Sequence, residues 1–162
     1  MESFPDHVKL VVQVYDRDDD VDWRMAEDIY YNIGIPPQEK NYLIVRSFEH
    51  EDDGCEIEAE TDAPLANDPY DDDELNAIDY YGVFRIVDAL GDYAFAGSTK
   101  GKAAAIGEGG EEVEIFMGVT ADGTRVTPMI STDDPEEHYD DDMDFSTEWD
   151  DLANQRLDEY DP

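Results

Sequence analysis

The first half of the chain alternates between apolar runs and polar segments in an order typical of parallel α/β proteins. A nearly unbroken apolar run over residues 8–15 predicts a strand that is covered on both faces. An acidic loop over 16–22 follows, and apolar residues then recur at helical spacing over 23–33. A second apolar run within 41–47 predicts another strand. Two strands that bracket a helix indicate a βαβ unit in a parallel sheet.

The second half is predicted to contain a long helix and a terminal hairpin. Residues 48–73 are polar and acidic, which predicts a long loop, and the apolar positions of 74–97 predict the longest helix. The Gly- and Ala-rich residues 98–110 predict a flexible connector. Residues 112–118 and 125–131 are short strand candidates, and the Asp122-Gly123 pair between them is a strong turn signal.

The pattern predicts one domain with a tail. The fold class is α/β, with a partial parallel sheet followed by a C-terminal β-hairpin, and the domain covers residues 1–131. Residues 132–162 are predicted to be an acidic, flexible tail with a short helix over 146–157.

The strongly negative net charge argues against some classes of binding partner. The chain has 162 residues, of which 45 are acidic and 10 are basic, giving a formal net charge of -35. Such a surface argues against nucleic acid and anionic membranes as partners. It is typical of a protein from a salt-rich cytoplasm, where mobile ions screen the self-repulsion, although an acidic protein from an ordinary cytoplasm has the same signature.

Targeting signals and cysteine usage agree with a cytoplasmic location. No apolar run approaches the roughly 20 residues of a membrane helix, and the first residues lack the pattern of a signal peptide. Cys55 is the single cysteine, so no intrachain disulfide is expected. Export stays open if a further segment precedes Met1.

Two residues stand out as a candidate catalytic pair. Asp18 follows the first predicted strand, and His50 follows the second. Because neighbouring parallel strands end at the same edge of a sheet, we expect the carboxylate and the imidazole to meet there. Asp16, Asp19 and Asp20 are alternatives for the acid, and the sequence does not choose among them.

Five segments of the chain follow the pattern of a known family. They are Val11-Val12-Gln13-Val14-Tyr15, Tyr42-Leu43-Ile44-Val45-Arg46-Ser47, Ala77-Ile78-Asp79-Tyr80-Tyr81-Gly82, Phe116-Met117-Gly118 and Asp122-Gly123-Thr124. With these segments the chain resembles the C-terminal portion of an α/β-hydrolase over about residues 8–134. The resemblance implies a partial hydrolase-type sheet, with Asp18 as the acid and His50 as the base of a Ser-His-Asp triad. It also implies hydrolysis of a carboxylic ester with no cofactor and no metal.

Two departures from the family pattern limit what this chain can do alone. Glu51 stands after the histidine, where the family usually has glycine, and no Gly-x-Ser-x-Gly nucleophile segment is present. We therefore expect the chain to be inactive alone and to act on a small-molecule ester only when a nucleophile-bearing half completes it. The partners to expect are that half or a second copy, because the strand over 8–14 would expose an unpaired edge in the isolated chain.

The alternative interpretation is a non-catalytic acidic protein that binds cations or a partner protein. Oxygen-bearing side chains fall at the spacing of a calcium-binding EF-hand loop, although Val21 occupies the position that needs glycine. These candidate ligands are Asp16, Asp18, Asp20, Asp22 and Glu27.

Overall fold

The computed structural model describes residues 4–5, 7–18, 23–50, 55–60, 75–107 and 110–138. Strands β1 (Leu10–Tyr15), β2 (Lys40–Val45) and β5 (Ile130–Thr132) form one sheet in the order β1-β2-β5. β1 runs parallel to β2, and β5 runs antiparallel to it. The fold is therefore mixed α/β, with β2 between its two neighbours.

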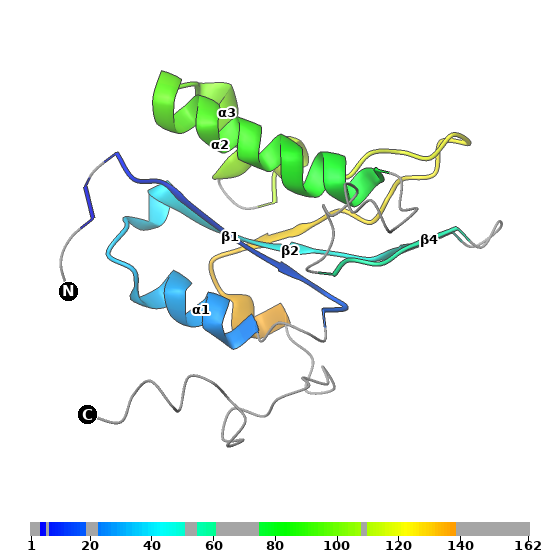
Figure 1. The fold of residues 1–162 in the computed structure, drawn as a ribbon, viewed down its shortest axis with the longest axis horizontal. Coiled ribbons are helices and arrows are strands. Elements are labelled where there is room, and N and C mark those ends of the chain that lie inside the picture. Colours follow the sequence, from blue (N-terminus) through cyan, green and yellow to red (C-terminus); the bar gives the residue numbers. More distant parts are fainter. Residues whose placement is uncertain are drawn as a thin grey trace, which may run out of the picture.

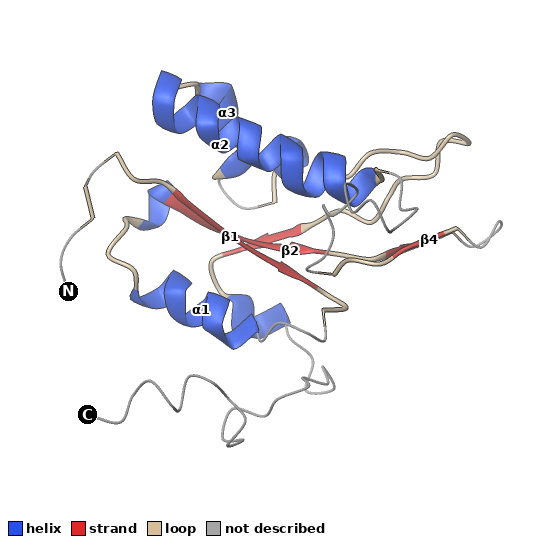
Figure 2. Ribbon diagram, in the orientation of Figure 1, coloured by secondary structure: helices blue, strands red, loops and turns tan. Residues whose placement is uncertain are grey.

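Helices cover both faces of this sheet (Figure 1). Helix α1 (Trp23–Asn32) lies on one face, and the π-helical segment η2 (Ile78–Phe84) continues into α2 (Arg85–Ala96) on the other, beside α3 (Thr99–Ala105). Figure 2 shows the strands as a middle layer between these helices. The remaining elements are η1 (Pro37–Glu39), β3 (Phe48–Glu49), β4 (Glu56–Ile57), α4 (Glu112–Ile115) and η3 (Pro135–His138).

Side chains on the two faces of β2 belong to two different apolar clusters. Leu43 and Val45 belong to the cluster that contains Ile78 of η2 and Ile86 of α2, while Tyr42 and Ile44 pack in the cluster that contains Tyr30 of α1. This alternation follows from the two-residue period of a strand. The predicted βαβ unit is thus confirmed, with a parallel β1-β2 pair and α1 between its strands in the chain.

Three predictions for the second half are wrong. The predicted connector over 98–110 contains α3, whose first turn is capped by Ser98 accepting a hydrogen bond from the Gly101 N–H at 3.1 Å. The predicted strand over 112–118 begins as helix α4, which a capping box between Glu111 and Glu114 holds. The loop predicted over 48–73 contains the antiparallel β3-β4 pair; residues 51–54 and 61–73 of it lie outside the described residues.

The terminal hairpin is correspondingly absent from the described residues. Only an isolated bridge joins Val119 to Arg125, and Ile130–Thr132 pairs with β2 instead. The predicted turn is present, because the Gly123 N–H donates to the Thr120 carbonyl at 3.0 Å and Gly123 has a φ of 93°.

The long predicted helix is present as η2 followed by α2. Gly82 in η2 lies against the core, and a Cβ there would lie 3.4 Å from Met117 Cε and 3.5 Å from Val45 Cγ1, which is ordinary van der Waals contact. Gly97 ends α2 in the left-handed conformation, with a φ of 66°.

The described fold continues to His138. The domain boundary predicted at residue 131 falls inside β5, and Pro135 in η3 is buried. Residues 139–162, including the predicted helix over 146–157, lie outside the described residues. In the part of the chain that is described, no helix is both long and apolar enough to cross a bilayer.

Candidate functional site

The carboxyl ends of β1 and β2 are joined by a side chain of the acidic loop. Asp16 Oδ1 accepts hydrogen bonds from the Ser47 backbone N–H at 2.9 Å and from Ser47 Oγ at 2.6 Å. The Ser47 hydroxyl in turn accepts from the Ala59 N–H at 2.9 Å. Asp16 therefore connects the two strand ends to the β4 segment, and its carboxylate is occupied by a structural contact.

Asp18 lies near the end of β1. Burial raises the pKa of Tyr15, and the charges of Asp18 and Asp79 raise it further. Asp18 is thus close enough to Tyr15 to affect its ionisation. The other two alternatives for the acid, Asp19 and Asp20, lie outside the described residues.

His50 lies in a different place, on the β3-β4 pair. Its backbone N–H donates to the Cys55 carbonyl at 2.7 Å, and its side chain is buried, with 5% exposed. The imidazole Nε2 lies 3.1 Å from Asp122 Oδ2 and 3.1 Å from Thr124 Oγ1. Its ring also packs edge-on against Phe48.

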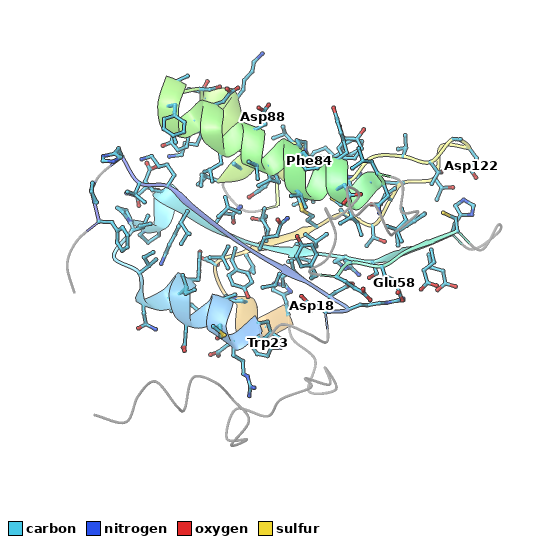
Figure 3. The ribbon with its side chains drawn as sticks, viewed as in Figure 1. Asp18, Trp23, Glu58, Phe84, Asp88 and Asp122 are labelled. Carbon is cyan, nitrogen blue, oxygen red and sulfur yellow. The ribbon has the colours of Figure 1, made fainter. Side chains whose placement is uncertain are left out.

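The structure does not bring Asp18 and His50 together. The acid bonded to the imidazole is Asp122, and Figure 3 shows Asp18 at the end of β1, well separated from Asp122 in its turn. The physical reason is that the chain continues past β2 into β3 before it reaches His50, which carries the histidine away from the edge where β1 ends.

Asp122 is well suited to hold an imidazole. Hydrogen bonds from the Thr120 hydroxyl, the Thr124 N–H and the Thr124 hydroxyl, together with the charge of His50, keep the pKa of Asp122 well below its usual range. A carboxylate beside Nε2 accepts a hydrogen bond when that nitrogen carries a hydrogen, and this contact fixes the orientation of the ring. Asp122 is therefore the described carboxylate that lies against the imidazole of His50.

None of the described serines contacts this pair. Ser47 bonds Asp16, Ser98 caps α3, and the Ser131 hydroxyl lies 3.0 Å from Asn41 Oδ1 and 2.6 Å from Glu114 Oε1. The described residues therefore place no hydroxyl nucleophile of serine at His50.

The predicted calcium loop also lacks its expected setting. The segment that enters it is strand β1, whereas an EF-hand loop is entered from a helix. Asp20 and Asp22 lie outside the described residues. Among the side chains that the structure describes, no group of three His, Cys, Asp or Glu residues is arranged to hold a metal ion.

A third candidate surface is the outer edge of β1. Within the described residues β1 pairs along one edge only, with β2. The Asp16 N–H donates to the Val45 carbonyl at 3.0 Å, so the backbone groups of Asp16 point toward β2. Because the backbone N–H and C=O groups of successive residues point to opposite edges of a strand, those of Val11, Gln13 and Tyr15 point to the outer edge, away from β2. No proline or charged residue interrupts the sequence LVVQVY of this strand.

The sequence analysis missed Asp122, although it placed this residue in a turn. It also missed Glu114, which is fully buried. Glu114 follows Glu111 by three residues, the spacing of a capping box, and this spacing was the sequence signal that could have identified it. A contact between residues 72 positions apart, such as that of His50 with Asp122, leaves no local pattern.

Comparisons with known proteins identify no relative. No protein-family model matches the chain, and no curated protein and no solved structure shows a significant match.

Proposed function

We propose that this chain is a protein-interaction module whose β1 edge accepts a strand from another chain. The observation that carries the proposal is the outer edge of an apolar strand, with which no described strand pairs. Val12 and Val14 of β1 are buried on the α1 side, and Val11 and Tyr15 pack toward the other cluster. A strand covered on both faces is typical of a sheet interior, and a charge-free edge without proline is a ready template for pairing.

A second copy is the simplest partner for this edge. Two β1 strands can pair antiparallel about a two-fold axis through Val12, and this register keeps the residues that face α1 on one side of the joined sheet. The net charge of -35 on each copy opposes association in dilute salt. Near molar salt the Debye length falls to about 3 Å, so we expect the association to strengthen there.

The experiment compares two proline variants by sedimentation equilibrium in dilute and molar KCl. Val11→Pro removes an outward N–H while it leaves the ladder to β2 intact, and we expect it to abolish association. Ala121→Pro is the matched control, because Ala121 occupies the second position of a turn that favours proline. A protein that is monomeric in both salts, or a Val11→Pro variant that associates as strongly as the parent, would refute the proposal.

A second candidate function is ester hydrolysis, and the His50–Asp122 contact favours it. In this proposal the chain supplies the base and the acid, and a nucleophile-bearing half supplies the attacking hydroxyl, as the resemblance to the α/β-hydrolases implies. The acid is Asp122, because its Oδ2 lies 3.1 Å from the imidazole. His50 takes the proton of the nucleophile, and Asp122 stabilises the resulting imidazolium.

The test measures hydrolysis of a p-nitrophenyl ester in molar KCl with a Gly-x-Ser-x-Gly half supplied as a separate polypeptide. We expect His50→Ala to abolish activity and Asp122→Asn to lower kcat by up to about 10⁴-fold, the loss typical of a triad acid. Asp18→Asn is the matched control and should leave kcat unchanged. Absence of activity in the parent, or equal losses in both aspartate variants, would remove this candidate.

A further inference from the structure

The outer surface of α2 carries a line of exposed apolar positions. Phe84, Val87 and Phe95 have 42%, 65% and 95% of their surface exposed. Together with Gly91 they recur every three or four residues, so they share one side of the helix. We call these four residues the α2 stripe. Figure 3 labels Phe84, the last residue of η2 and the N-cap of α2, on the side of the sheet opposite α1.

The core does not account for the α2 stripe. Ile86 is the buried residue of α2, with 3% exposed, and it packs with Val45 and Met117 on the inner side of the helix. At Gly91 a Cβ would meet nothing within 4 Å, so the middle of the α2 stripe is open. Single exposed apolar residues are ordinary, but three large ones on the same side of one helix, in so acidic a chain, are typical of an interaction surface.

Acidic side chains run along one flank of the α2 stripe. Asp88 and Asp92 are exposed and stand one turn apart on α2. The one basic side chain of α2, Arg85, is directed to the backbone carbonyls of Tyr81, Val113 and Glu114. The flank of the α2 stripe that carries Asp88 and Asp92 is therefore negative.

The negative charge beside the α2 stripe favours a partner with positive charge. A second copy docked on the α2 stripe would bring its own Asp88 and Asp92 against this acidic row, and like charges at close range oppose such a contact. A segment with apolar residues on one face and lysine or arginine beside them would satisfy both features. Its apolar residues would lie over Gly91 between Val87 and Phe95, and its cations would reach Asp88 and Asp92.

We propose that the α2 stripe is the docking site for a cationic amphipathic helix of another protein. This site is separate from the β1 edge, so either proposal can fail without the other. The helix lies in line with α2, as in other complexes where an amphipathic helix presents anchors at three- and four-residue spacing.

The test titrates the full chain with a synthetic amphipathic Leu/Lys helix and, in parallel, with a Leu/Glu helix of the same apolar pattern. The measurement is calorimetry in molar KCl, where general attraction to a charge of -35 is screened. We expect saturable binding of one Leu/Lys helix per chain and no binding of the Leu/Glu helix. Val87→Ser and Phe95→Ser should each weaken binding by roughly tenfold or more without a change in net charge.

The matched control is Val119→Ser, which changes a valine that is 59% exposed outside α2 and should leave binding unchanged. Because Val87 and Phe95 are largely exposed, their variants should fold, and circular dichroism checks this. The proposal is overturned if the Leu/Lys helix does not bind, or if it binds all variants equally. It is also overturned if sedimentation shows that the chain self-associates and that Phe95→Ser abolishes this association, since the occupant would then be a second copy.

Discussion

The side chains of Asn41 and Glu114 meet in the core, with Asn41 Nδ2 2.7 Å from Glu114 Oε1. Asn41 lies in β2 and Glu114 in α4, so the contact joins the sheet to the segment that leads into the Asp122 turn. The same carboxylate accepts from the Gly110 N–H at 2.8 Å and lies 2.6 Å from Ser131 Oγ. A fully buried carboxylate is thus surrounded by donors.

We therefore expect Glu114→Gln to destabilise the protein. The new amide group would direct its N–H donors at groups that are themselves donors, and leaving buried polar groups unsatisfied costs about 1–3 kcal/mol. Chemical unfolding in molar KCl measures the change. Glu112→Gln is the control, because its ion pair with Arg125 is exposed and is worth about 1 kcal/mol at most. Equal losses in both variants would contradict a special role for Glu114.

Acid should weaken the contacts of Glu39. Burial alone would raise the pKa of Glu39, but hydrogen bonds from Lys9, Tyr93 and Lys102 lower it from 4.5 to about 2. Because the folded state favours the ionised form, this stabilisation is complete above pH 4.5 and is lost as the pH falls toward 2. Glu39→Gln should cost on the order of 1 kcal/mol at neutral pH, after allowance for solvent screening, and should lose this effect in acid. Unfolding curves across this pH range, with Glu49→Gln as an exposed control, measure it.

The pH dependence of stability expected for Glu27 is opposite to that expected for Glu39. Burial, a hydrogen bond with Glu136 and the charges of Glu136, Asp28 and Asp134 together raise the pKa of Glu27 from 4.5 to about 7. The stabilisation from the protonated form is complete below pH 4.5 and is lost as the pH rises through about 7. Glu27→Gln should therefore stabilise the protein above pH 7, by on the order of 1 kcal/mol, and have little effect near pH 4. A variant with the same stability difference at both pH values would show that proton binding at Glu27 is not the cause.

The opening βαβ unit was predictable because its signals are local. The run of valines in β1 and the helical spacing of Trp23, Ala26 and Tyr30 in α1 each identify one element, and a helix between two apolar runs predicts a parallel pair. These residues pack against one another in one apolar cluster, so local preference and tertiary structure agree.

The elements of the second half were harder to predict from the sequence because tertiary contacts determine their secondary structure. Residues 112–115 look like a strand in isolation, yet burial of Glu114 among donors from β2 and the neighbouring loop favours a helical turn. The acid that lies beside His50 was hard to predict for the same reason. The sequence identified His50, but the acid beside it comes from a turn 72 residues later, and this choice depends on how two loops pack.

The packing of α2 on α3 gives a last pair of predictions with opposite signs. Gly101 faces α2, and a Cβ there would lie 2.5 Å from the Ala89 carbonyl oxygen and 3.0 Å from the Tyr93 nitrogen. Since backbone atoms cannot move aside cheaply, Gly101→Ala should separate the helices and cost about 1–3 kcal/mol. A Cβ on Gly91 would meet nothing within 4 Å, so Gly91→Ala should stabilise α2 by up to about 1 kcal/mol through helix propensity. Thermal unfolding of the two variants measures both effects. If Gly101→Ala were as stable as Gly91→Ala, the two helices would not pack as closely as the Ala89 contact requires.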